Sequence, residues 1–489
     1  MFKSLAKTKN IYFIGVKGVG MTMLAQFLAS KGNKVSGSDI VDTFLTDKVL
    51  RRAKIKVFSP FNAMNIPARP DLIIYSSAYN VANNSELKFI KDNPARFKNI
   101  KILSYAEALG QVFNSYQGIA VCGSHGKTTT SAWLGYVLWR AGKRPNILTG
   151  SYVPQFNSSG LIGNSPYFVA EVDEYQNKLQ YFEPRGVILN NIDYDHPDFF
   201  KTPAAYVKVF SDFIKKIPRT GFLIINRRDL TVRKIKRFSC AKIISYDLLP
   251  NSVQAASPSS VKADYLAYDL KVKNGYQVFK VSYQKKYLGE FKISLWGEHS
   301  VLNALAVIAA ARQLKVPFNL IKKHLAGFKG TERRTQVLGK YKGAIIIDDY
   351  AHHPTEIATT LKGLRACYPR QNLITVFHPH TFTRTKALFK DFVRSFKDTD
   401  ELIILDIYGS ARESAIRQLA EAKGGVSSRQ LTDAIIKFNR RQKIIQTVKH
   451  IASIPQATAY LRKILKKRDI LLLMGAGDVF RIGQTILKK

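Results

Sequence analysis

The chain is poor in cysteine, in acidic residues and in long apolar runs. Its 489 residues include three cysteines and 35 acidic residues, against 76 lysines and arginines. Three widely spaced cysteines make neither a disulfide framework nor a paired metal-binding motif, which is typical of a reducing compartment. No apolar run approaches the roughly 18 residues that a membrane crossing needs. The sequence therefore predicts a cytoplasmic protein without stable membrane insertion.

The shortage of acids leaves a formal net charge of +41. Two interpretations of this charge stay open. The summed field could attract polyanions, including nucleotides, or the charge could reflect a general lysine bias on solvated faces. The basic residues are spread along the chain, whereas a nucleic-acid-binding protein is expected to concentrate them on one face. We therefore expect no nucleic-acid partner.

The segment GSHGKTTT, at residues 123–130, has the pattern of a phosphate-binding loop. It follows an apolar, β-prone stretch, GIAVC, and opens a helical pattern. In this context backbone amides at the helix N-terminus hold phosphate oxygens, the lysine reaches the β- and γ-phosphates, and the next threonine binds Mg²⁺. Val121 stands where the strict pattern has glycine. The residues predicted to bind ATP here are Gly123, Ser124, His125, Gly126, Lys127, Thr128 and Thr129.

Two further predicted strands end in acidic residues. The stretch YFVAEVDE, residues 167–174, finishes with three acids, and GVILNNIDYDH, residues 186–196, runs into two aspartates and a histidine. A carboxylate at a strand end beside a phosphate loop is a suitable place for a hard divalent cation. One such turn would carry little weight because Asp and Asn favour turns anyway. Two in one sheet predict a Mg²⁺·ATP site, in which Mn²⁺ could replace Mg²⁺.

Residues 11–40 show the alternation of strand, glycine turn, helix and strand that is typical of a βαβ unit. The glycine spacing differs from the dinucleotide fingerprint, so the pattern predicts a mononucleotide or pyrophosphate site. An acid at the end of the second strand often binds a ribose hydroxyl, although it could also only cap the strand. A later buried strand ends in two serines at the same expected edge. The residues of this predicted site are Gly15, Gly18, Gly20, Asp39, Ser76 and Ser77.

Repeated α/β units divide the chain into three predicted domains. One break near residues 110–118 precedes the phosphate-loop strand, and a second near 327–331 precedes a third α/β series. Single cores stop growing near about 250–300 residues, which also favours several domains. We predict an α/β protein with an N-terminal Rossmann-like domain at 1–110, a central P-loop ATPase-type domain at 111–330 and a C-terminal Rossmann-like domain at 331–489.

Seven motifs, which span most of the chain, occur in the order found in Mur ligases. They are GSHGKTTT, EVDE, NNIDYDH, GEHSVLNALA, GTERR, DDYAHHPTE and HPHTFTR. The chain therefore resembles this family of ATP-dependent enzymes, which build the peptide of the peptidoglycan precursor. Within the family, GVKGVGM, SGSD, SSA and DIYGSARE are most similar to the branch that adds L-alanine to UDP-N-acetylmuramate. The alternative is the branch that attaches the recycled tripeptide L-Ala-γ-D-Glu-meso-diaminopimelate.

The resemblance implies that ATP activates the muramate carboxylate as an acyl phosphate, which an amine then attacks with release of ADP and phosphate. It implies UDP-sugar binding by the first domain, ATP binding by the second and amino-acid binding by the third. The implied catalytic residues are Lys127, Glu171, His196, Arg334 and Asp349. The implied metal ligands are Thr128 and Glu171 for a first Mg²⁺ and His196 for a second metal. The further implied ATP contacts are Asn303, Arg334 and Asp349, and the amino-acid contacts are His353, His380 and Arg384.

Several positions keep an alternative interpretation. His353 precedes a proline and could be a helix-start residue, and His380 follows a proline and could be a structural turn. Ser300 stands where the family has asparagine, so Asn303 could make the adenine contact alone. Thr381 stands where some relatives have arginine, so glycine and L-serine stay open beside L-alanine. The sequence identifies no carbamylated lysine, for which Lys208 is the nearest candidate.

Two other classes of function compete with the ligase. An NTP-driven nucleic-acid enzyme would suit the charge, but no helicase motif set follows the phosphate loop. A nucleotide-binding protein without catalysis is disfavoured by the intact Lys127, Glu171 and His196. The sequence does not fix the oligomeric state, and we expect a monomer or a homodimer.

Overall fold

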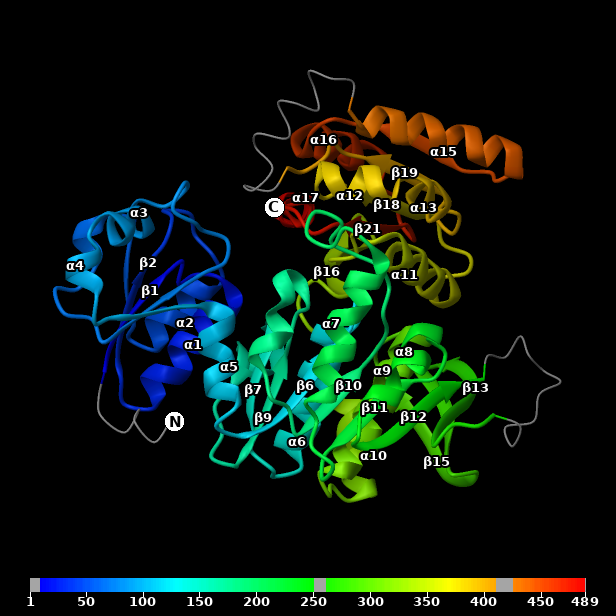
Figure 1. Cartoon of the computed structure of the whole chain (residues 1–489). Helices are drawn as coiled ribbons and strands as arrows, with labels where there is room; N and C mark the ends of the chain where they lie inside the picture. Colours follow the sequence, from blue (N-terminus) through cyan, green and yellow to red (C-terminus); the bar gives the residue numbers. More distant parts are fainter. Residues whose placement is uncertain (1–8, 250–260, 410–424, 489) are drawn as a thin grey trace. The chain divides into compact units, whose positions relative to one another are not determined.

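The computed structural model of the chain describes residues 9–249, 261–409 and 425–488. These residues form three sheets (Figure 1). The chain divides into two compact units. Unit 1 comprises residues 1–192, 207–247 and 304–328, and unit 2 comprises residues 193–206, 248–303 and 329–489. Helix α5 (Tyr105–Phe113) runs without interruption through position 110, where the sequence suggested a domain boundary. No helix of the described ranges has both the length and the apolar character needed to cross a membrane.

The first sheet of unit 1 is parallel and carries the N-terminal glycine turn. Its strand order β3-β2-β1-β4-β5 is that of a doubly wound fold, with the reversal beside β1. Helices α1 and α2 are drawn on one side of the blue strands in Figure 1, and α3 and α4 on the other. The bounds are β1 Asn10–Ile14, α1 Val19–Ser30, β2 Lys34–Ser38, α2 Thr46–Arg52, β3 Lys56–Phe58, β4 Leu72–Tyr75, α3 Ser85–Asp92, α4 Pro94–Phe97 and β5 Lys101–Ser104.

The second sheet carries the phosphate loop. Within unit 1 its strands are ordered β12-β11-β10-β6-β9-β7-β8. Strand β6 pairs in parallel with β10 on one side and β9 on the other. The carboxyl ends of these three strands therefore meet at one edge. The bounds are β6 Gln117–Cys122, α6 Lys127–Arg140, β7 Asn146–Val153, β8 Ser158–Leu161, β9 Tyr167–Glu171, β10 Gly186–Leu189, α7 Pro203–Lys215, β11 Phe222–Asn226, α8 Leu230–Ile235, β12 Lys242–Leu248, α9 Glu298–Gln313 and α10 Phe318–Gly327.

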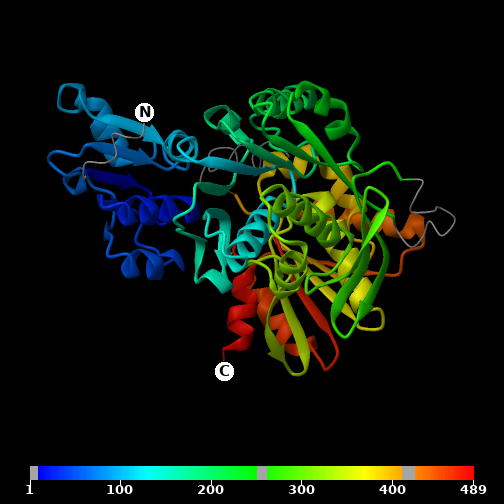
Figure 2. The same cartoon turned by 90° about the horizontal axis from the view of Figure 1, so that it is seen from below.

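Unit 2 contains an antiparallel meander, β13-β14-β15, and the third sheet, ordered β16-β17-β21-β18-β19-β20. All neighbours in the third sheet are parallel except the hairpin β16–β17, which Figure 2 shows beside the red helix α17. The bounds are β13 Tyr265–Lys273, β14 Tyr276–Tyr283, β15 Lys286–Ile293, β16 Gln336–Tyr341, β17 Ala344–Asp349, α11 Pro354–Cys367, β18 Leu373–Phe377, α12 Phe382–Ala387, α13 Phe389–Arg394, β19 Glu401–Ile404, α15 Ser428–Gln442, β20 Thr447–His450, α16 Ile454–Ile464, β21 Ile470–Met474 and α17 Phe480–Leu487.

Two apolar cores sandwich the third sheet. Side chains of α11, α13 and α15 form one core with the strands, and those of α16 and α17 form the other. Strands covered on both faces need continuous apolar sequence, which the run ILLLM of β21 supplies. This is the α/β layering that the sequence predicted. Part of the DIYGSARE motif, residues 410–413, lies outside the described residues.

Candidate functional site

The phosphate loop joins β6 to α6 in a conformation that glycine permits. Gly123 has φ +122° and Gly126 has φ +78°. A Cβ atom at Gly123 would lie 2.7 Å from the carbonyl oxygen of Asn191. Gly126 is the residue directly before α6, and a helix N-terminus presents backbone amides and a partial positive charge to an anion. The geometry is therefore that of an anion cradle.

Two asparagines at the end of β10 hold this loop in place. The backbone amide of Ser124 donates to the Asn191 carbonyl at 3.1 Å, and that of His125 donates to Asn191 Oδ1 at 2.8 Å. Asn190 Nδ2 donates to the His125 carbonyl and to Thr130 Oγ1, each at 3.2 Å. Sequence reasoning missed this role. The only feature of the sequence that indicates this role is the pair of asparagines directly after an apolar strand.

Lys127 folds back over the loop. Its Nζ donates to the carbonyls of Gly123 at 2.5 Å and Ser124 at 3.1 Å, and pairs with Glu174 at 3.2 Å. The Glu174 side chain is 1% exposed and that of Lys127 is 15% exposed. Burial alone would lower the pKa of Lys127, but nearby carboxylates, Glu174 first, raise it above its ordinary value. The ammonium is therefore charged and directed at the loop.

Thr128 and Glu171, two predicted metal ligands, lie side by side. Thr128 Oγ1 donates to Glu171 Oε1 at 3.0 Å, and the amide of Gly150 donates to Glu171 Oε2 at 2.6 Å. Val121, which replaces the glycine of the strict pattern, is the β6 residue opposite Glu171 in the register. A hydroxyl and a carboxylate oxygen at one point are the hard donors that Mg²⁺ prefers, so this pair fits the predicted ion.

The N-terminal glycine turn is tied to Asp39. The amides of Lys17 and Ile40 donate to the two Asp39 oxygens at 2.6 and 2.8 Å, and the Tyr79 hydroxyl donates at 3.3 Å. Asp39 is 3% exposed, and its burial raises its pKa. Asp39 thus organises the turn in this structure, which agrees with the capping interpretation and leaves the ribose contact as a prediction.

Two of the predicted UDP-sugar glycines, Gly15 and Gly20, lie where a side chain would be crowded. Gly15 has φ +84°, and a Cβ there would lie 2.9 Å from Ser76 Cβ. A Cβ at Gly20 would collide with the hydroxyl of Tyr105. Gly18 precedes helix α1, and Ser77 follows Ser76 at the end of β4. The structure therefore brings the glycine turn and the serine pair to one edge of the first sheet.

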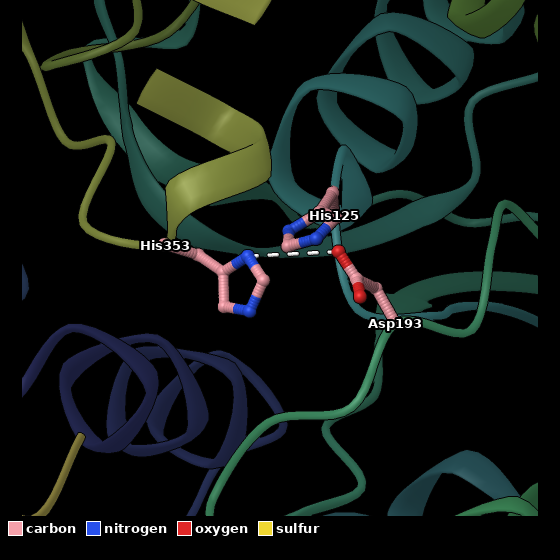
Figure 3. A group of neighbouring side chains, drawn as sticks. All are labelled: His125, Asp193 and His353. Carbon is pink, nitrogen blue, oxygen red and sulfur yellow. Dashed lines mark ion pairs between the residues drawn. The ribbon is translucent and has the colours of Figure 1, made fainter. Parts of the chain in front are cut away.

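In unit 2, His353 begins helix α11 and faces Asp193. Thr355 N donates to His353 Nδ1 at 3.3 Å, so the imidazole caps its own helix. The same Nδ1 lies 3.5 Å from Asp193 Oδ2 (Figure 3), and Thr355 Oγ1 donates to that oxygen at 2.6 Å. The helix-start interpretation of His353 therefore holds, and it coexists with a contact to the acidic segment.

Arg384 forms a buried ion pair that the sequence did not suggest. Its Nε and Nη2 donate to Asp195 Oδ1 at 3.0 Å and Oδ2 at 3.3 Å, and its Nη1 lies 3.3 Å from His380 Nδ1. Burial would raise the pKa of Asp195, but Arg384, with His196 and His352, holds it well below its ordinary range. The carboxylate is therefore ionised, and it occupies one side of the guanidinium that we predicted to bind the amino acid.

Two histidines beside this pair, His352 and His380, are uncharged at neutral pH. Burial, reinforced by Arg384, lowers the pKa of His352 to about 3 and that of His380 to about 4. The His380 ring stacks on Tyr408 with centroids 5.7 Å apart. His196, the third predicted metal ligand, belongs to unit 2 and has φ +56°. Its Nε2 lies 3.8 Å from Asp195 Oδ2.

Asp349 is the last residue of β17, and Arg334 lies in the segment just before β16. Asp349 Oδ2 accepts from the amide and the hydroxyl of Thr335 at 2.7 and 2.9 Å. Arg334 lies 3.8 Å from Glu356 and 5.2 Å from the centre of the Tyr350 ring. Asp349 therefore holds the loop that follows Arg334.

Asn303, the predicted adenine contact, lies on α9 one turn after His299. It is 9% exposed. Burial lowers the pKa of His299 to about 4, so this imidazole is also neutral. The two side chains share one face of the helix because they are four residues apart.

Comparison with known proteins gives the family. Residues 10–117 match "Mur ligase family, catalytic domain", residues 121–311 "Mur ligase middle domain" and residues 333–477 "Mur ligase, glutamate ligase domain". A Desulfitobacterium hafniense protein named UDP-N-acetylmuramate–L-alanine ligase is 36% identical over 479 residues, which are 98% of this chain and 99% of that protein. This chain belongs to the Mur ligase family.

Other relatives agree. A Clostridium kluyveri protein of the same name is 38% identical over 485 residues, 99% of each chain. The crystal structure of a UDP-N-acetylmuramate-alanine ligase from Thermotoga maritima matches with a TM-score of 0.76 at 23% identity, over 98% of each chain, and so has the same fold. The family and the α/β fold class predicted from the sequence are confirmed.

Proposed function

We propose that this Mur ligase joins L-alanine to UDP-N-acetylmuramate and converts ATP to ADP and phosphate. The names of full-length relatives support this substrate pair. The geometry supports the use of ATP, and one observation carries it. The hydroxyl that follows the phosphate-loop lysine lies 3.0 Å from a carboxylate at the end of the neighbouring strand. A charged lysine, a helix N-terminus and two hard oxygen donors together suit a metal-bound triphosphate.

The proposed roles follow the order of the three predicted domains. Residues 1–110 would bind the UDP-sugar through the glycine turn, Asp39 and the serine pair. Residues 111–330 would bind ATP through the phosphate loop, with Asn303 on the adenine. Residues 331–489 would bring Arg334 and Asp349 to the nucleotide and His353, His380 and Arg384 to the amino acid.

Activation of the acid is the first proposed step. A carboxylate is a poor electrophile because oxide is a bad leaving group. An oxygen of the muramate carboxylate attacks the γ-phosphorus, and the bond to the bridging oxygen breaks, so that ADP leaves and an acyl phosphate remains. Lys127 would neutralise charge on the transferring oxygens. Thr128 and Glu171 would hold Mg²⁺, which when bound supplies further neutralisation of phosphate charge, and His196 would hold a second metal ion near the acyl phosphate.

Amide formation is the second step. The amine of the amino acid attacks the acyl carbon, and the tetrahedral intermediate collapses with loss of phosphate. Two nitrogens of Arg384 already face Asp195, so the amino-acid carboxylate would meet the guanidinium on its Nη1 side, beside His380. A guanidinium fixed on one side gives directional recognition on the other.

Acceptor competition tests the proposal. Purified protein with UDP-N-acetylmuramate and Mg²⁺·ATP is given L-alanine, glycine, L-serine or the tripeptide L-Ala-γ-D-Glu-meso-diaminopimelate, and ADP and amide are measured. We expect amide first with L-alanine. Amide only with the tripeptide would favour the recycling reaction, and no acceptor-dependent ADP release would refute the ligase.

A further inference from the structure

Unit 1 contains a cavity of about 180 Å³ between two of the predicted sites. Its walls include Gly20 in the first turn of α1, Tyr105 at the start of α5, and Glu171 beside Thr128. A molecule bound at the glycine turn could therefore extend through the cavity to the predicted metal ligand. Under the function proposed above, the nucleotide of the UDP-sugar would lie at the glycine turn and its carboxylate would lie near the metal ligand.

The charges of the cavity wall disfavour an acid unless a cation takes part. Glu171 and Asp173 line the cavity, and Lys178 is the only basic residue among the described residues that line it. The Lys178 ammonium lies 2.6 Å from Asp173 Oδ2. Its side chain is 15% exposed, whereas that of Asp173 is 42% exposed. Two carboxylates would repel a third, since like charges a few ångströms apart disfavour each other strongly in a partly buried site.

The backbone before Lys178 is held in an unfavourable conformation. Gln176 and Asn177 both have left-handed φ, of 57° and 55°. For glutamine this costs roughly 1–2 kcal/mol, whereas asparagine adopts the left-handed region more readily. Such strain persists where the surrounding structure imposes it, often at ligand sites. The same segment brings the Lys178 ammonium over the Tyr175 ring, 5.3 Å from its centre. A simple surface lysine would need no such arrangement.

We propose that Lys178 binds the carboxylate of the acid substrate and thereby selects nucleotide sugars that carry an acid. The inference rests on the proposed function, in which that substrate is UDP-N-acetylmuramate. An ammonium has three donors, so Lys178 can keep Asp173 on one and offer another to the ligand. The acid is then held at the wall that also contains Glu171.

Calorimetric titration of two sugars without ATP tests this role. UDP-N-acetylmuramate carries the acid, and UDP-N-acetylglucosamine is its counterpart without the lactyl carboxylate. Lys178→Met should weaken binding of the first by about 10- to 100-fold, the loss expected for a hydrogen bond between charged groups. It should change binding of the second by less than about twofold. Lys88→Met is the matched control, because Lys88 is also paired with an acid, Asp92, but is 68% exposed on α3.

Further variants separate recognition from folding. Lys178→Arg should restore much of the affinity for the acid sugar. The single variant Lys178→Met leaves Asp173 without its lysine, and the double variant Asp173→Asn, Lys178→Met also removes that acid. The double variant should bind UDP-N-acetylmuramate as weakly as Lys178→Met does. In turnover, Lys178→Met should raise KM for the acid sugar and leave KM for ATP near the wild-type value.

Three results would overturn the inference. Equal losses for both sugars would assign Lys178 a structural role, as would recovery of affinity in the double variant. Unchanged binding of the acid sugar by Lys178→Met, with normal turnover of the wild type, would refute the inference and leave the proposed function standing. A wild-type protein that binds neither sugar would refute the proposed function itself.

Discussion

Replacement of Lys127 by methionine tests two separate consequences of its position. The ammonium neutralises Glu174, whose side chain is 1% exposed. Removal of one partner from a buried ion pair typically costs about 3–5 kcal/mol. Lys127→Met should therefore lower the free energy of unfolding by that amount, measured by urea denaturation. Adding Glu174→Gln removes the carboxylate that has lost its lysine and should return most of the stability.

The double variant then isolates the catalytic effect. A folded protein without the Lys127 ammonium should release ADP about 10²- to 10³-fold more slowly at saturating substrates, the loss typical of one preorganised group that stabilises developing charge. Glu174→Gln alone is the control, because it keeps Lys127 and its contacts with the loop carbonyls. Binding of the UDP-sugar, measured by calorimetry, should be unchanged in all three variants. If the double variant kept more than about a tenth of the wild-type turnover, the assignment of this loop would be wrong.

Three further expectations follow from the same structure. Excess chelator should abolish ADP release, and Glu171→Gln should raise the Mg²⁺ concentration that gives half-maximal turnover; metal-independent activity would contradict the Thr128–Glu171 site. Arg384→Ala should raise KM for the amino acid far more than KM for ATP, and should also destabilise the fold because Asp195 loses its cation. Burial lowers the pKa of His299 from 6.5 to about 4, so the unfolded chain gains a proton first as the pH falls. As the pH falls from 6.5 to about 4, the free energy of unfolding should drop by about 1.4 kcal/mol per pH unit. His299→Gln should make this dependence of stability on pH less steep.

Local patterns were enough to predict the elements around the phosphate loop. The apolar stretch GIAVC became β6, which begins one residue earlier, and the loop glycines adopt the positive φ values that the motif requires. Apolar runs such as ILLLM predicted the buried parallel strands. A strand that is covered on both faces has apolar residues at successive positions rather than at every second one, so it stands out in the sequence. The order of the seven motifs along the chain was enough to predict the family.

Contacts between distant segments could not be predicted. Asp195 and Arg384 are 189 residues apart, and no local pattern couples an acidic turn to a later helix. The left-handed backbone before Lys178 was equally hidden, since tertiary contacts decide where residues other than glycine adopt it. The roles assigned to Lys127 and Thr128 follow from the phosphate-loop pattern, those of most other catalytic residues rest on the family resemblance, and all of them stay predictions.

The asparagine pair at the end of β10 bears on the speed of nucleotide exchange. Fixing one residue of backbone costs roughly 1–2 kcal/mol of entropy, so a loop that became ordered only around its ligand would lose several kcal/mol of affinity. In this chain Asn190 and Asn191 hold Ser124 and His125 through the folded protein itself. A nucleotide bound by this loop would therefore meet a cradle that is already formed, and we expect its arrival and departure to be limited by diffusion and metal contacts rather than by rearrangement of the loop.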